Sequence, residues 1–91
     1  MYFYDKCLNQ EIIMKKVKSS NISCIGYFES DSLLYICFNE TESVYRYKNI
    51  PKSLYDKLME AKSKGTFLSE KIKPFPKKYS YKKLKGGIYA R

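Results

Sequence analysis

The chain has 91 residues, of which 44% are hydrophobic, and it carries a net charge of +9 with no histidine. A chain of this length holds one hydrophobic core, which excludes a second domain. It contains no run of eighteen apolar residues and no basic-then-apolar signal segment at its start, which argues against a membrane span and against export. We therefore expect a single small domain that works in the cytoplasm, with no membrane partner.

The residues that usually carry chemistry argue against an enzyme. Cys7, Cys24 and Cys37 are odd in number and lack the C-x-x-C spacing of zinc sites, so we expect reduced thiols. The absence of histidine leaves no such base to activate a cysteine or serine nucleophile, and the nine acidic residues are scattered along the chain. We therefore expect no catalytic residue, no metal and no cofactor.

The first predicted elements in chain order are two strands of a hairpin. Residues 21–28 and 33–38 both show apolar side chains with a period of two, and the polar residues 29–32 separate them as a turn. The register that joins the two aliphatic faces sets four pairs opposite each other, namely Phe28 with Leu33, Tyr27 with Leu34, Ile25 with Ile36 and Cys24 with Cys37.

A third strand is predicted at residues 44–47, after a polar turn at residues 39–42. The period of two places Tyr45 and Tyr47 on one face and Arg46 on the other. Because burying an arginine is costly, we expect the tyrosines to face the core and Arg46 to face away from it.

One main helix follows the strands. Pro51 predicts its start, because the missing N–H of proline does no harm at the first helical position. Leu54, Leu58 and Ala61 repeat at helical spacing and form a stripe that can lie across the sheet. Gly65 predicts the end of this helix as a left-handed cap.

Residues 66–72 predict a short second helical turn, after which Pro74 and Pro76 end the regular structure. The predicted fold class is therefore α+β. We expect an antiparallel meander of three strands, or four if one more joins, packed by one main helix and followed by a basic C-terminal tail.

The sheet face opposite the tyrosines is also apolar, through Ile22, Cys24, Phe28, Leu33, Tyr35 and Cys37. A half-exposed sheet should not have two apolar faces, so we expect something to cover this one. The candidates are the N-terminal residues 1–4 and 12–13, a second copy of the chain, or a ligand stacked on Phe28 and Tyr35 beside Arg46. We also expect self-association, at least to a dimer, through this face or the N-terminal extension.

The C-terminal tail holds nearly all of the excess charge. Residues 1–70 carry ten basic and nine acidic side chains, whereas residues 71–91 carry eight basic ones and no acid. Lysines interleaved with tyrosines suit contact with phosphates plus stacking on bases, although a run of lysines is equally typical of a solvated surface. Because Pro74 and Pro76 precede residues 77–91 and the lysines repel one another, we expect that segment to be loosely ordered.

An ordered series of motifs runs through the chain, consisting of residues 17–22, Ile25-Gly26-Tyr27, the alternating Leu34, Ile36 and Phe38, Tyr45-Arg46-Tyr47, Ile50-Pro51, residues 58–61 and Ser63-Lys64-Gly65. Over roughly residues 14–84 the chain thereby resembles the KTSC domain family. That family is found at the C-terminus of some lysyl-tRNA synthetases and in stand-alone small bacterial and phage-type proteins, and the synthetase connection implies RNA binding. We divide the chain into an N-terminal extension (1–13), a KTSC-like core (14–76) and a basic aromatic tail (77–91).

These features predict a non-enzymatic binding module for phosphate-bearing ligands, most of all RNA or another nucleic acid. The candidate ligand-binding residues are Phe28, Tyr35, Arg46, Lys77, Lys78, Tyr79, Tyr81, Lys82, Lys83 and Lys85. Two alternatives stay open. One is an oligomeric binder that sequesters a nucleotide-like small molecule, as a phage-type anti-defence protein would, and the other is a protein–protein adaptor or inhibitor.

Overall fold

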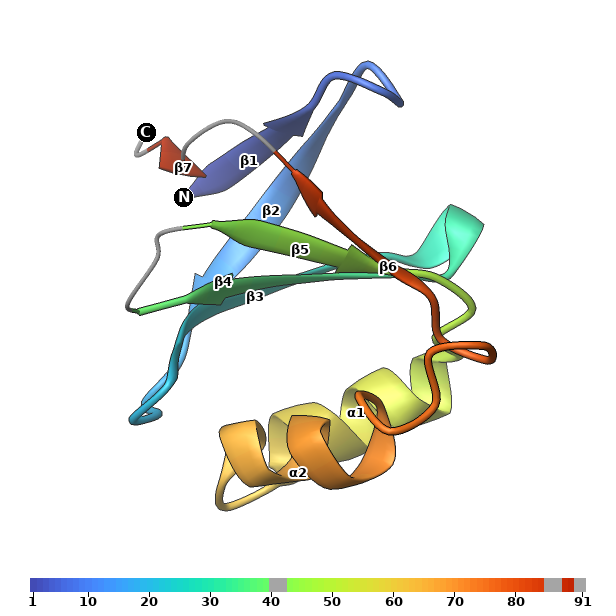
Figure 1. The fold of residues 1–91 in the computed structure, drawn as a ribbon. Helices are drawn as coiled ribbons and strands as arrows, with labels where there is room; N and C mark the ends of the chain where they lie inside the picture. Colours follow the sequence, from blue (N-terminus) through green and yellow to red (C-terminus); the bar gives the residue numbers. More distant parts are fainter. Residues whose placement is uncertain (40–42, 85–87, 90–91) are drawn as a thin grey trace.

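The computed structural model describes residues 1–39, 43–84 and 88–89, and the described part contains a seven-stranded antiparallel sheet and two α-helices (Figure 1). The strands are β1 (Tyr2–Asp5), β2 (Gln10–Lys16), β3 (Ile22–Phe28), β4 (Leu33–Phe38), β5 (Val44–Tyr47), β6 (Tyr81–Leu84) and β7 (Ile88–Tyr89). The helices are α1 (Lys52–Glu60) and α2 (Lys64–Lys71), and a 3-10 turn, η1 (Glu29–Asp31), joins β3 to β4. The strand order is β6-β5-β4-β3-β2-β1-β7, so the predicted three- or four-stranded meander is only the middle of a larger sheet.

The sheet is curled. β6 and β7 lie at opposite edges of the strand order, yet only three residues separate Leu84 from Ile88 in the sequence. A chain of that length spans at most about 14 Å, so the two edges must approach each other. Figure 1 shows β1 and β7 above β5, with β2 crossing diagonally behind β5 and β4, while both helices lie below the other face of the sheet. We call the helix-facing side the outer face and the enclosed side the inner face.

The central hairpin confirms the predicted register. All four predicted pairs between β3 and β4 are present, and the third strand follows on β4. One assignment was wrong, because Ile22 packs on the outer face and not beside Cys24 on the inner face. The register shifts between these two residues, and such a bulge turns the side chains before it to the other face.

The outer face carries the core that packs against the helices. Its buried members are Ile22, Ile25, Leu34, Ile36, Tyr47, Ile50, Leu58, Leu68, Ile72 and Tyr79. Tyr45 is half-buried against this core, so the prediction that both tyrosines of β5 face the helices is confirmed. The predicted stripe of α1 is also present, with Leu58 buried and Leu54 partly buried.

The inner face holds a second core, which the N-terminal hairpin of β1 and β2 covers, so the expectation of one hydrophobic core was wrong. Its buried members are Phe3, Ile12, Met14, Cys24, Leu33, Tyr35, Cys37, Val44 and Leu84. Of the three covers considered from the sequence, the N-terminal segment is the one present, and self-association stays a prediction. Gly26 permits this close packing, since a Cβ there would lie 2.5 Å from Met14 Sδ and 2.8 Å from the Ile13 carbonyl oxygen.

The second helix is longer than predicted, and Gly65 is not a helix cap. α1 ends at Glu60, and Gly65 is buried within α2. The start of α2 is set by Ser63, whose hydroxyl accepts the backbone N–H of Thr66 at 3.3 Å. Neither helix, within the described part of the chain, has the length and apolarity needed to cross a membrane.

The tail prediction was wrong for the residues up to 84. β6 pairs with β5 along its whole length, and Tyr79 just before it is buried. The reason is that the tail carries apolar groups for both cores, Tyr79 for the outer one and Leu84 for the inner one. Residues 85–87 and 90–91 of the predicted tail, and residues 40–42 of the predicted turn, lie outside the described residues.

Candidate functional site

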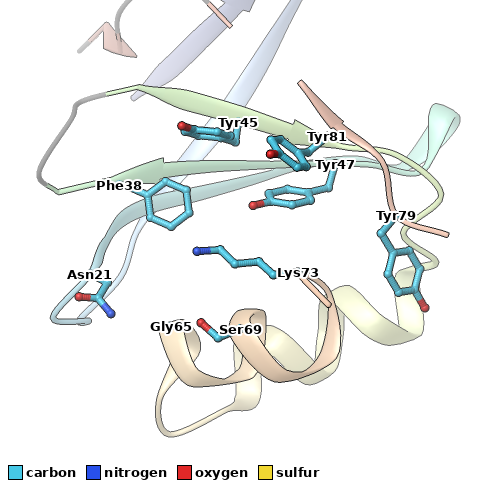
Figure 2. Close-up of a pocket in the computed structure, with 9 residues that line it drawn as sticks. All are labelled: Asn21, Phe38, Tyr45, Tyr47, Gly65, Ser69, Lys73, Tyr79 and Tyr81. Carbon is cyan, nitrogen blue, oxygen red and sulfur yellow. The ribbon is translucent and has the colours of Figure 1, made fainter. Parts of the chain in front are cut away.

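A cleft of about 520 Å³ lies between the outer face of the sheet and α2 (Figure 2). Its lining residues are Asn21, Phe38, Tyr45, Tyr47, Gly65, Ser69, Lys73, Tyr79 and Tyr81. The volume falls within the range of roughly 300–1,000 Å³ that small-molecule sites occupy. We call this cavity the tyrosine cleft.

The strand register builds an aromatic wall along the sheet side of the cleft. The pairing of Tyr47 with Tyr81 and of Tyr45 with Lys83 places all four side chains on the outer face. The ring centroid of Tyr81 lies 5.9 Å from that of Tyr45 and 5.8 Å from that of Tyr47. Phe38 extends the wall by an edge-on contact with Tyr45 at 5.4 Å. Because Tyr81 is 58% exposed, its ring is open to a stacking partner.

A lysine faces this wall from the helix side. Lys73 follows α2, and its ammonium lies 4.9 Å from the centroid of the Phe38 ring, a cation–π contact. Figure 2 shows its side chain reaching across the cleft toward Phe38 and Asn21. Lys73 makes no ion pair with any described residue, and none of the described residues that line the cleft carries a carboxylate. The cleft therefore suits an aromatic ligand that carries negative charge.

Tyr47 presents a hydrogen-bond donor inside the cleft. The residue is only 3% exposed, and its hydroxyl points into the cleft without a partner among the described residues (Figure 2). Burial raises the pKa of Tyr47 to about 12, with a further contribution from Tyr45 and Tyr81, so the phenol stays neutral at pH 7. Among the described residues, only Arg46 Nε is a buried side-chain polar atom without a partner, so the Tyr47 hydroxyl is open to the cleft and can donate to a ligand acceptor.

The candidate residues Arg46 and Tyr35 lie far from this cleft, on the inner face. Asp5 accepts hydrogen bonds through Oδ2 from Arg46 Nη1 and from the Tyr35 hydroxyl, both at 2.6 Å. Arg46 is 7% exposed and Tyr35 is fully buried, so the prediction that Arg46 faces away from a core was wrong. Asp5 offsets the cost of that burial by pairing with the guanidinium.

The pKa of Asp5 reflects this arrangement. Burial alone would raise it, but the hydrogen bonds from Tyr35 and Arg46 and the charge of Arg46 outweigh burial and hold the pKa below its usual value. The backbone N–H of Cys7 adds a hydrogen bond to Oδ1 at 3.0 Å. In this structure the carboxylate of Asp5 pairs with Arg46 Nη1, where the sequence predicted a ligand.

The other candidate residues lie in several separate places. Tyr79 and Tyr81 line the cleft, as a ligand-binding role requires. Lys83 lies beside the cleft on the outer face, whereas Lys82 is opposite Arg46 on β6. Two groups lie elsewhere, with Lys77 and Lys78 exposed before β6 and Phe28 packed against the inner core. Lys85 lies outside the described residues.

Several cleft residues were absent from the candidates derived from the sequence, namely Asn21, Phe38, Tyr45, Tyr47, Ser69 and Lys73. The period of two in β5 could have identified Tyr45 and Tyr47, because it places both on one face. A tyrosine at the border of a core can bury its ring and still present its hydroxyl to a ligand. Asn21 and Ser69 come from segments 48 residues apart in sequence and carry no such signal.

Comparisons with known proteins agree on the relationship of this chain. The KTSC domain family matches residues 18–83. A protein of Tsukamurella paurometabola is 33% identical over 61 residues, which is 67% of this chain and 90% of the relative. The crystal structure of a KTSC domain protein from Yersinia pestis superposes with a TM-score of 0.74 at 32% identity, covering 81% of this chain and 99% of that one. With more than half of its residues matched and the fold shared, the chain belongs to the KTSC domain family.

Proposed function

We propose that this protein is a non-enzymatic module that binds phosphate-bearing ligands, above all RNA, in the tyrosine cleft. The observation that supports the proposal most is the aromatic wall of Tyr45, Tyr47 and Tyr81 across the cleft from Lys73, whose ammonium makes no ion pair with a described residue. Proteins that bind single strands combine these two elements, because every base has a face that can stack and every phosphate carries a negative charge.

The open ring of Tyr81 favours an unpaired base. Stacking of one base on an aromatic side chain contributes about 1–3 kcal/mol, and a base within a duplex does not offer its face. The neutral hydroxyl of Tyr47 can donate to a carbonyl or phosphate oxygen of the ligand. The cleft therefore favours single-stranded over double-stranded nucleic acid.

The charges around the cleft favour phosphate. Lys83 lies on the outer face beside Tyr45, and Lys73 lies across from it near Phe38. Lysine acts on phosphate as a flexible point charge and does not read bases through paired hydrogen bonds. We therefore expect affinity that depends strongly on salt and weakly on sequence.

A small nucleotide is the second candidate ligand, and the size of the cleft favours it. A volume of about 520 Å³ suits one ligand of drug-like size. Lys73 and Tyr47 could then hold the phosphate and the base of the same molecule. The response to salt separates the two candidates, because binding across several phosphates weakens more steeply as salt rises.

The test is fluorescence anisotropy of a labelled single-stranded RNA at several salt concentrations. We expect Tyr81→Ala to weaken binding by about 5- to 150-fold, the equivalent of one lost stack. Lys73→Gln should flatten the slope of log affinity against log salt by about 0.7. The matched controls are Tyr4→Ala and Lys57→Gln, which change exposed side chains outside the cleft. Failure of the wild type to bind at low salt, or equal losses in the controls, would refute the proposal.

A further inference from the structure

A second hollow adjoins the tyrosine cleft. It has a volume of about 460 Å³ and is lined by Ser30, Asp31, Ser32, Asn49, Pro51, Lys78 and Tyr79. Tyr79 lines both cavities, so this one residue borders each of them. We call the second cavity the Tyr79 hollow.

Hydrogen bonds between distant segments hold the Tyr79 hollow in shape. Asn49 donates its side-chain N–H to the carbonyl oxygen of Lys78 at 3.2 Å, and the neighbouring Lys48 donates its backbone N–H to the carbonyl oxygen of Ser80 at 2.8 Å. On the other side, Ile50 donates its backbone N–H to the carbonyl oxygen of Ser32 at 3.0 Å. The hollow is therefore formed before any ligand enters, which lowers the entropy cost of binding.

The charged groups of the hollow are not paired with each other. Lys78 holds its ammonium 5.3 Å from the centroid of the Tyr79 ring and makes no ion pair with a described residue. Asp31 is exposed, and its carboxylate has no salt-bridge partner in the described part of the chain. An ammonium suits a phosphate, whereas a carboxylate repels a phosphate and accepts a hydrogen bond from a sugar hydroxyl.

We propose that the tyrosine cleft and the Tyr79 hollow form one path for a single-stranded RNA of at least two nucleotides. The inference rests on the proposed function and names its substrate class. One base stacks in the cleft, the strand passes Tyr79, and the next nucleotide places its phosphate at Lys78 and its ribose at Asp31. Because the 2′-hydroxyl is the group that DNA lacks, Asp31 gives the path a preference for RNA.

The test compares a mononucleotide with a tetranucleotide of the same base, the latter as RNA and as DNA. We expect the wild type to bind the RNA tetranucleotide at least about fivefold more tightly than the mononucleotide, since a further stack and phosphate contact are gained. Lys78→Gln should flatten the salt slope for the tetranucleotide by about 0.7 and leave mononucleotide affinity unchanged. Asp31→Asn should narrow the difference in affinity between the RNA tetranucleotide and the DNA tetranucleotide. Lys57→Gln and Glu60→Gln, both exposed on α1, are the matched controls.

Three results would overturn the path. They are equal affinity for mononucleotide and tetranucleotide, equal losses on both ligands in Lys78→Gln, and an unchanged RNA-to-DNA ratio in Asp31→Asn. Each of these three results would still allow nucleotide binding in the tyrosine cleft. None of them is therefore the same outcome as failure of the proposed function. If none of the three ligands binds at low salt, the proposed function and the path are refuted together. Circular dichroism of each variant checks that it is folded.

Discussion

Replacing Asp5 by asparagine tests how the N-terminal hairpin is held on the inner face. The substitution keeps the size of the side chain and an acceptor for the Tyr35 hydroxyl, but it removes the charge that pairs with Arg46. Arg46 is 7% exposed, and its Nε already has no hydrogen-bond partner among the described residues, so the variant leaves a buried guanidinium without a counterion.

The expected loss in the free energy of unfolding is about 3–5 kcal/mol, because removing one partner of a buried ion pair leaves the other charge uncompensated. That loss is a large part of the roughly 5–15 kcal/mol that stabilises a typical domain. Urea denaturation followed by circular dichroism measures it as a lower midpoint. The triple variant Asp5→Leu, Tyr35→Phe and Arg46→Met should recover much of the stability, since it replaces the buried pair, and the Tyr35 hydroxyl whose hydrogen bond Asp5 accepts, by apolar groups.

Asp56→Asn is the matched control, because it removes the exposed pair between Lys52 and Asp56 on α1. Its urea midpoint should stay close to that of the wild type, since exposed pairs contribute little. A loss below about 1 kcal/mol in Asp5→Asn would refute the reasoning. It would mean that the hairpin opens readily and lets water reach Arg46.

Three more predictions follow from burial and packing. Because the folded pKa of Asp5 is lowered, its contribution to stability is complete above about pH 4 and is lost as pH falls through the folded pKa. The urea midpoint of the wild type should therefore drop more steeply in acid than that of Asp5→Asn. Parallel curves of urea midpoint against pH for the two proteins would contradict this. A thiol reagent should label only the exposed Cys7 in the native protein and all three cysteines in urea. The reason is that Cys24 and Cys37 are buried, and that burial and the neighbouring Cys37 raise the pKa of Cys24 to about 11. Rapid labelling of more than one thiol in the native protein would count against this prediction. Gly26→Ala should lower stability by about 1–3 kcal/mol through overpacking. Gly65→Ala should cost less, because the nearest atoms to its Cβ would be those of the Asn21 side chain at 3.2–3.8 Å. A reversed order in urea melts would refute the packing argument.

The sequence was informative where structure depends on near neighbours. The β3–β4 register, the outward turn of Tyr45 and Tyr47 toward the helices, and the stripe of α1 were all predicted, because alternation and helical spacing repeat within a few residues. The bulge before Cys24 was missed, since one extra residue in a strand leaves no mark on an otherwise regular pattern.

The strands at the edges of the sheet were missed for a different reason. β1, β2 and β6 lie outside the predicted meander, and each is stabilised by a partner strand and a core that the rest of the chain provides. Arg46 shows the same dependence, because its counterion Asp5 lies 41 residues away in the sequence. Strand propensity depends on such surroundings, so short segments of this kind give weak signals alone.

The sequence by itself determined the family, the class of fold and the basic, aromatic composition that suits a phosphate-bearing ligand. Only the tertiary structure decided where the proposed ligand site lies, because it brought Phe38, Lys73 and Tyr81 to one cleft and closed the Arg46 face with the N-terminal hairpin. Alternation and spacing act over a few residues, whereas a cleft is formed by segments that meet only when the sheet has curled and the helices have packed against it.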